Sequence, residues 1–162
     1  KILVCGSPRS GKSALVARYA TGLSPDPFLS AYLQTLGAEL VIKHVVEGEN
    51  RLSLHLWSVG GHPRYRSTVT PLLTDDTAAV LVTVDLLSAS SLEDAAVWVA
   101  LAKEHCPTAI VYLIGTKADE TDKITVSMPE LAKVARDAGA TAPLKTTSAR
   151  TGAGVTDLFA DL

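Results

Sequence analysis

A glycine-rich segment near the start of the chain carries residue types that hold phosphate groups: Gly6-Ser7-Pro8-Arg9-Ser10-Gly11-Lys12-Ser13. Its spacing matches G-x-x-x-x-G-K-[ST], in which the glycines let the backbone turn tightly, so that successive N–H groups face phosphate oxygens. In such a segment the amine of Lys12 would supply positive charge to the outer phosphates, and the Ser13 hydroxyl can bind Mg²⁺. A flexible glycine loop without a ligand is the alternative. An apolar strand-like run precedes the segment and a helical pattern follows it, which favours a nucleoside triphosphate site.

A second polar segment, Gly115-Thr116-Lys117-Ala118-Asp119, follows another predicted buried strand. Alone, a Lys-x-Asp sequence is more typical of a solvated turn, but the expected strand order brings this one beside the phosphate loop. A carboxylate at Asp119 can accept hydrogen bonds from the N1–H and the exocyclic amine of guanine, whereas adenine lacks those donors. Thr147-Ser148-Ala149-Arg150 follows the next strand, where a backbone N–H can meet the guanine oxygen. The two segments together predict a site for guanine.

The elements that must position these segments alternate between strands and helices. Apolar and β-rich runs predict strands over residues 1–5, 39–46, 51–59, 78–84, 109–114 and 143–146, with the second and third joined as a hairpin. Helical spacing predicts helices over 13–20, 90–105, 127–138 and 151–162, two of them opened by capping boxes at Ser90–Glu93 and Ser127–Glu130. Residues 60–76 read as irregular. This order predicts an α/β fold: a mostly parallel six-stranded sheet, one antiparallel edge hairpin, and helices on both faces. Ligands bind such sheets at the carboxyl ends of the strands.

Composition limits the class of protein further. The chain has 162 residues, of which 47% are hydrophobic and 20% charged, and this suits one folded domain over residues 1–162. The formal net charge of −2 argues against a dedicated nucleic-acid-binding protein. Cys5 and Cys106 form neither a disulfide framework nor a zinc-binding pattern, which favours a reducing compartment. The chain opens inside a strand, and its last helix is short, so we expect a trimmed fragment whose membrane attachment is not visible.

With both motifs in this order and at this separation, the chain resembles the Ras superfamily of small GTPases over essentially all of its length. The segment Tyr32-Leu33-Gln34-Thr35-Leu36-Gly37 is similar to the first switch of the Rab branch. Leu54-His55-Leu56-Trp57 and Arg64-Tyr65-Arg66-Ser67-Thr68-Val69-Thr70 are similar to Rab sequences around the second switch. The resemblance implies the G domain of the P-loop NTPases, GTP and GDP as ligands with Mg²⁺, and location in the cytoplasm, including at a membrane or cilium.

The resemblance also implies roles for individual residues. Thr35 would bind Mg²⁺ beside Ser13 and sense the γ-phosphate, and Gly61 would donate its N–H to that phosphate. Phe28 would pack against guanine and Tyr32 would cover the phosphates, although ordinary packing is the alternative for both. For Thr35 the alternative is a loop threonine without a ligand. Thr116, Lys117, Asp119, Ser148, Ala149 and Arg150 would form the guanine site. Effector or scaffold proteins would bind switch I (Phe28 to Gly37) and switch II (Gly60 to Asp76).

Three residues depart from the family pattern in the places that serve hydrolysis. Ser58 stands where the family has an aspartate that reaches Mg²⁺ through water, and a neutral hydroxyl there weakens the metal site. His62 replaces the glutamine that orients the attacking water; a neutral imidazole can hold water, but a surface histidine is the alternative. Pro8 replaces a glycine next to the γ-phosphate and removes a backbone donor. We therefore expect nucleotide binding with slow hydrolysis.

The sequence is compatible with three functions. The first is a Rab-like regulator of trafficking or transport that is switched by GTP and GDP. The second is a pseudo-GTPase subunit of an assembly such as the intraflagellar transport train, in which GTP is a structural ligand. The third is a P-loop kinase or ATPase, which the segment Thr116-Lys117-Ala118-Asp119 argues against.

Overall fold

The computed structural model describes residues 1–23 and 35–162. Its strands are β1 (Ile2–Gly6), β2 (Ala38–Glu47), β3 (Asn50–Val59), β4 (Ala79–Asp85), β5 (Ile110–Thr116) and β6 (Lys145–Thr146). Its helices are α1 (Lys12–Thr21), α2 (Arg66–Val69), α3 (Ala89–His105), α4 (Met128–Ala138) and α5 (Val155–Ala160). Short 3₁₀ turns lie at η2 (Pro63–Tyr65), η3 (Thr70–Leu72) and η4 (Thr121–Lys123).

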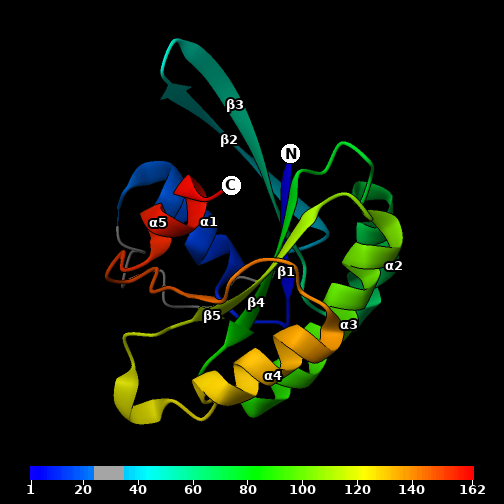
Figure 1. Ribbon diagram of the computed structural model, residues 1–162, viewed down its shortest axis with the longest axis vertical. Helices are drawn as coiled ribbons and strands as arrows, with labels where there is room; N and C mark the ends of the chain where they lie inside the picture. The colour runs from blue at the N-terminus through cyan, green and yellow to red at the C-terminus, as the bar shows by residue number, and fades with distance from the viewer. Residues whose placement is uncertain (24–34) are drawn as a thin grey trace.

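The six strands form one sheet in the order β2-β3-β1-β4-β5-β6 (Figure 1). β1 runs parallel to both β3 and β4, and β4–β5 and β5–β6 are also parallel pairs. β2 and β3 form the antiparallel hairpin, in which Glu47 pairs with Asn50 at the turn. The predicted α/β class, the parallel sheet and the edge hairpin are therefore confirmed.

Side-chain alternation along the central strands divides the core into two layers. In β1, Leu3 and Cys5 point to the layer beneath α3 and α4, whereas Ile2 and Val4 point to the layer beneath α1 and α5. β4 and β5 alternate in the same way, because successive side chains of a strand face opposite sides of the sheet. Figure 1 shows α1 and α5 on one side of the sheet and α3 and α4 on the other. The prediction of helices on both faces is confirmed.

Helix starts agree with the prediction at α4 and differ at α3. In α4, Ser127 and Glu130 form the expected capping box, in which each side chain bonds the other residue's backbone N–H. The box predicted at Ser90–Glu93 is wrong: α3 begins one residue earlier, at Ala89, with Ser88 as its N-cap. Ser91 uses its hydroxyl as a donor to the carbonyls of Asp85 and Ser88, which ties the helix start to the end of β4.

Three other bounds differ from the sequence prediction. Residues 63–72 form short helical turns where irregular structure was expected, because Pro63 and Pro71 each stand in a first helical turn and favour its start. β6 contains only Lys145 and Thr146, and α5 begins at Val155 rather than at residue 151. Among the described helices, none combines the length and the apolar character that crossing a membrane requires.

Candidate nucleotide-binding site

The glycine-rich segment lies where β1 ends and α1 begins, at the carboxyl edge of the parallel sheet. Gly6 has a φ of +136°, and a Cβ at this position would lie 2.4 Å from the Thr83 carbonyl oxygen of β4. Gly11 has a φ of +85°, which glycine adopts without strain. Arg9, between them, is exposed and also has a positive φ of 63°. The two glycines thus allow the sharp turn that packs the loop against β4.

Lys12 is buried and turns its amine back over the loop. Its Nζ donates to the carbonyl oxygens of Gly6 at 3.1 Å and Ser7 at 2.6 Å, and lies 3.4 Å from the Ser10 hydroxyl. Burial lowers the pKa of Lys12 from 10.5 to about 8, since the charged amine has lost its water. A phosphate oxygen would give this amine the anionic partner that the carbonyls do not.

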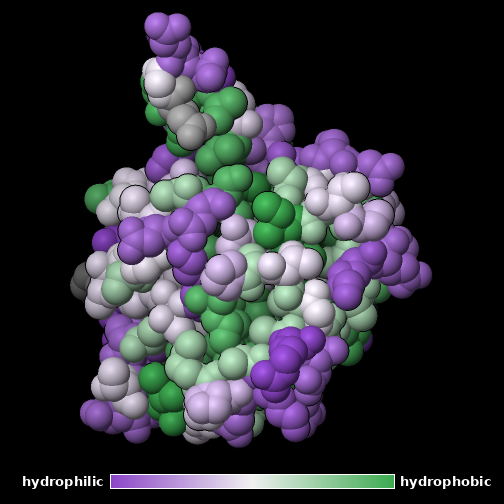
Figure 2. Space-filling model, in the orientation of Figure 1, coloured by the Kyte–Doolittle hydropathy of each residue, from purple (hydrophilic) through white to green (hydrophobic). Residues whose placement is uncertain are grey.

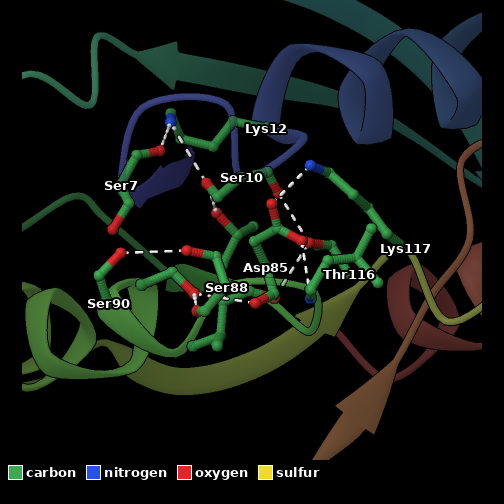
Figure 3. A network of polar contacts seen from close by, with 12 residues as sticks. Ser7, Ser10, Lys12, Asp85, Ser88, Ser90, Thr116 and Lys117 are labelled. Carbon is green, nitrogen blue, oxygen red and sulfur yellow. Dashed lines mark hydrogen bonds and ion pairs between the residues drawn. The ribbon is translucent and has the colours of Figure 1, made fainter. Parts of the chain in front are cut away.

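Hydroxyl groups connect the phosphate loop to the neighbouring strands (Figure 3). The Ser10 hydroxyl lies 2.6 Å from that of Thr83, and Ser10 is fully buried. Thr116, at the end of β5, donates its hydroxyl to the carbonyl oxygens of Ser10 at 2.8 Å and Val84 at 3.0 Å. The loop and the Thr-Lys-Ala-Asp segment are therefore one hydrogen-bonded unit, as the strand order predicted.

The residues expected to bind guanine follow β5. Lys117 has a positive φ of 60°, and its Nζ pairs with Asp85 at the end of β4 at 2.5 Å. The side chain of Asp119 is 14% exposed, and its Oδ2 lies 3.5 Å from Nη1 of Arg150. The same Nη1 lies 2.8 Å from Glu120. The carboxylate of Asp119 is thus largely buried, three residues after Thr116, whose hydroxyl bonds the phosphate loop.

The predicted partner segment, residues 147–150, lies directly against this one. The N–H of Ala118 donates to the Thr147 carbonyl oxygen at 3.2 Å, and Ser148 is buried. The Ser148 hydroxyl accepts the N–H of Thr151 at 3.0 Å, which closes a tight turn before α5. Ala149 is half-buried in this turn, next to Arg150. The structure therefore brings the two candidate guanine segments together.

Three hydroxyls meet at the other end of the phosphate loop. The Ser13 Oγ lies 3.1 Å from Thr35 Oγ1 and 3.0 Å from Ser58 Oγ, and Ser58 is fully buried. Adjacent ligands of an octahedral Mg²⁺ lie about 3 Å apart, given metal–oxygen distances of about 2.1 Å, so Ser13 and Thr35 have the spacing of two such ligands. No set of three or more His, Cys, Asp or Glu side chains able to hold a metal occurs within residues 1–23 and 35–162. The Ser13 and Thr35 hydroxyls fit Mg²⁺ as neutral ligands. The negative charge at the site would therefore come from phosphate oxygens.

The start of switch II packs directly on the phosphate loop. A Cβ on Gly61 would lie 2.4 Å from the Gly6 carbonyl oxygen and 2.6 Å from the nitrogen of Pro8, so only glycine allows this approach. Gly60 contacts the end of switch I, where its N–H donates to the Gly37 carbonyl oxygen at 2.7 Å. This places Gly61 at the edge of the loop, where the resemblance expected a donor to the γ-phosphate.

His62 is exposed and has a structural partner. Its Nδ1 accepts the N–H of Arg64 at 3.3 Å and caps the 3₁₀ turn that begins at Pro63. The imidazole also lies edge-on to the ring of Tyr65, with 6.4 Å between the ring centroids. An Nδ1 that accepts this bond leaves Nε2 as the nitrogen that can face water.

Some expected residues lie outside the part that the structure describes, and some polar residues were missed. The expected residues outside the described part are Phe28, Tyr32 and the rest of switch I before Thr35. The missed polar residues are Asp85 and Asp94: Asp85 pairs with Lys117, and Asp94 pairs with the loop residue Ser7. The position of Asp85 at the end of a buried strand was a usable signal, whereas Asp94 stands within a helix and no motif marks it.

Comparison with known proteins agrees with this geometry. The Ras family model matches residues 1–162. The chain is 31% identical over 163 residues to the Ras-related protein Rab5 of Nicotiana tabacum, an alignment that covers 100% of this chain and 78% of that protein. Members of the family bind guanine nucleotides, generally together with Mg²⁺. The chain therefore belongs to the Ras family and is a Rab-like small GTPase.

Proposed function

We propose that this protein binds GTP and GDP with Mg²⁺, hydrolyses GTP slowly, and regulates a trafficking or transport step in the cytoplasm, at a membrane or a cilium. The observation that carries the proposal is the largely buried carboxylate of Asp119, which follows by three residues the Thr116 hydroxyl that bonds the phosphate loop. Such a carboxylate selects a base with two donors on one edge, and guanine has them. The trafficking role rests on the similarity to the Rab branch.

Slow hydrolysis is supported by two side chains, Ser58 at the candidate metal site and His62 at the start of switch II. Ser58 is buried 3.0 Å from Ser13 and would bring no negative charge to a Mg²⁺ ion, whose chemistry there would be to neutralise phosphate charge. His62 already accepts a hydrogen bond from Arg64, so Nδ1 is engaged and the ring is held at the surface. With a weaker metal site and no glutamine, GTP would persist longer than in relatives that have both residues.

The pseudo-GTPase remains a second candidate because the same observation at Ser58 favours it. A metal site that lacks the charged side chain suits a nucleotide that is not hydrolysed, so that GTP would remain GTP and order the fold. In that case the protein would be a constitutive subunit of an assembly such as the intraflagellar transport train. The two candidates differ in whether GTP is ever converted to GDP.

Partner proteins would bind at the switch segments and the adjoining hairpin. Leu36 is 75% exposed, and Leu40 and Ile42 of β2 are 40% and 50% exposed. The hairpin of β2 and β3 projects from the body of the molecule, and Figure 2 shows apolar surface along it. Exposed apolar side chains that extend from Leu36 of switch I into β2 suit an effector or scaffold protein.

Competition binding tests the base assignment. Asp119→Asn should weaken GTP binding roughly 100-fold or more and admit xanthine nucleotides, because the amide offers a donor where guanine needs an acceptor. Glu120→Gln is the matched control, since Glu120 also contacts Arg150 and lies next in the chain. Unchanged GTP affinity in Asp119→Asn would show that the base assignment is wrong.

Single-turnover hydrolysis tests the slow-turnover proposal. The parent should hydrolyse GTP more slowly than about 10⁻⁴ s⁻¹, the scale of unassisted Ras-type enzymes. The double variant Ser58→Asp with His62→Gln should be faster if these positions cause the low rate. Fast turnover in the parent would refute the proposal, and an unimproved double variant would shift the cause to Pro8.

A further inference from the structure

A chain of polar contacts leads from the phosphate-binding lysine to switch II. Lys12 Nζ donates to the Ser7 carbonyl oxygen at 2.6 Å, and the Ser7 hydroxyl donates to Asp94 Oδ2 at 2.8 Å. The other oxygen of this carboxylate, Oδ1, accepts from Nη2 of Arg66 at 3.3 Å. Arg66 is the first residue of α2, whereas Asp94 stands on α3. One carboxylate on α3 therefore bonds both the phosphate loop and switch II.

The guanidinium of Arg66 contacts two residues of α3, Asp94 and Trp98. It lies 5.7 Å from the ring of Trp98, one helical turn after Asp94, and its side chain is 29% exposed. Its Nε is buried and has no hydrogen-bond partner within the described chain. Loss of the Asp94 carboxylate would leave a half-buried cation without its anion, so Arg66 would be released toward water.

Gly61 provides a second contact between the loop and switch II. A Cβ at Gly61 would lie 2.5 Å from the carbonyl carbon of Ser7 and 2.6 Å from the Pro8 nitrogen. Residues 62–65, which include His62, therefore lie between two attachment points, Gly61 on the loop backbone and Arg66 on Asp94. The conformation of this turn depends on both.

We propose that Asp94 is a positioning residue that joins the phosphate loop to switch II through Ser7 and Arg66. The inference rests on the proposed function, because a nucleotide is what would perturb the loop. The Lys12 ammonium has three N–H donors, of which the Gly6 and Ser7 carbonyls accept two, so a bound phosphate pulls on the same amine that holds the Ser7 backbone. Ser7 in turn bonds Asp94 through its hydroxyl. Binding at the phosphate site thereby changes the contacts that position Arg66 and the turn at residues 62–65. In this chain the link supplements the metal route, which Ser58 weakens.

Amide hydrogen exchange of switch II tests the link. The proteins compared are the parent, Asp94→Ala, Ser7→Ala, the double variant, and the control Glu93→Gln, which removes an exposed neighbouring carboxylate of α3. Each is measured without nucleotide, with GDP and with a non-hydrolysable GTP analogue. Asp94→Ala should speed exchange of the residue 61–69 amides about tenfold, because a partly exposed charge-assisted bond contributes about 1.4 kcal/mol.

The pattern among variants separates a positioning role from general destabilisation. Ser7→Ala should act in the same direction, and should add nothing once Asp94 is alanine. Asp94→Ala should also reduce the difference in switch II exchange between the GDP and GTP-analogue forms, while α4 and α5 exchange as in the parent. The proposal is overturned if Asp94→Ala leaves switch II exchange unchanged, or if Glu93→Gln has the same effect.

Failure of the proposed function would be seen separately. If the parent binds no guanine nucleotide, the proposed function fails, and the nucleotide-free measurement alone decides the link. Faster exchange of residues 61–69 in nucleotide-free Asp94→Ala would then still support it, and unchanged exchange would overturn it.

Discussion

Replacing Lys12 with methionine should separate two effects of its buried charge. The charge lowers the free energy of unfolding of the nucleotide-free protein, and it strengthens nucleotide binding. Burial lowers the pKa of Lys12 from 10.5 to about 8. At about 1.4 kcal/mol per pKa unit, the charged amine costs the nucleotide-free protein about 3 kcal/mol at pH 7. The hydrogen bonds from Nζ to the Gly6 and Ser7 carbonyls stabilise the folded protein by about 1 kcal/mol each and offset part of this cost. Lys12→Met should therefore raise the free energy of unfolding by about 1 kcal/mol while GTP affinity falls roughly 100-fold.

The pH dependence of the free energy of unfolding tests whether the charged Lys12 amine destabilises the folded protein. A lowered amine pKa means that, between about pH 8 and pH 10.5, the unfolded chain holds a proton on Lys12 that the folded protein has lost. The free energy of unfolding contributed by this group therefore rises with pH through that window, and below it the full penalty remains. Urea unfolding of nucleotide-free parent and Lys12→Met across pH 7 to 10 measures the difference, in which all other titrating groups cancel.

Two results would refute this reasoning. One is a Lys12→Met variant that is less stable than the parent by more than about 1 kcal/mol at pH 7, which would mean that the carbonyl bonds outweigh burial. The other is a difference between parent and variant that does not change with pH.

The remaining predictions concern four other positions. Ser58→Asp should slow EDTA-induced nucleotide release about 10-fold or more by adding an anionic group beside Mg²⁺, and should destabilise the nucleotide-free protein by burying that charge; faster release would contradict it. Gly61→Ala should lower the free energy of unfolding by about 1–3 kcal/mol in urea, because its Cβ meets loop backbone, and an unchanged value would show that switch II can move away freely. Ser127→Ala should cost about 1 kcal/mol by removing the α4 cap, with the exposed Ser90→Ala as control. Cys5 should resist thiol reagents until the protein unfolds, since burial raises its pKa to about 12, and rapid labelling at neutral pH would show that β1 opens.

Most of the fold and the phosphate site were predictable because they depend on backbone geometry that the glycine positions and the apolar pattern of the sequence indicate. Gly6 and Gly11 occupy positive-φ positions where the motif required them, and the strand order follows from alternating apolar strands and helices. Thr116 lies against the loop, and Asp119 follows it by three residues, because the carboxyl ends of parallel strands meet at one edge of the sheet.

What could not be predicted depends on side chains that meet only in the folded chain. Asp94 and Arg66 are separated by β4 and stand on helices, so no local pattern shows that they pair with each other and with Ser7. The start of α3 was placed wrongly because Ser88, Ser90 and Ser91 all resemble N-caps, and the contact of Ser91 with the Asp85 carbonyl decides among them. Residues 63–72 read as irregular because proline marks both loops and first helical turns.

The nucleotide that copurifies with the protein tests the central claim most directly. Protein purified in Mg²⁺ buffer is denatured, and the released nucleotides are separated by ion-exchange chromatography and quantified against protein. Binding through Asp119 and the phosphate loop predicts about one guanine nucleotide per chain. GDP would favour the switched regulator, and GTP the pseudo-GTPase. Adenine nucleotide in its place, or no nucleotide together with no binding of added GTP, would contradict the account.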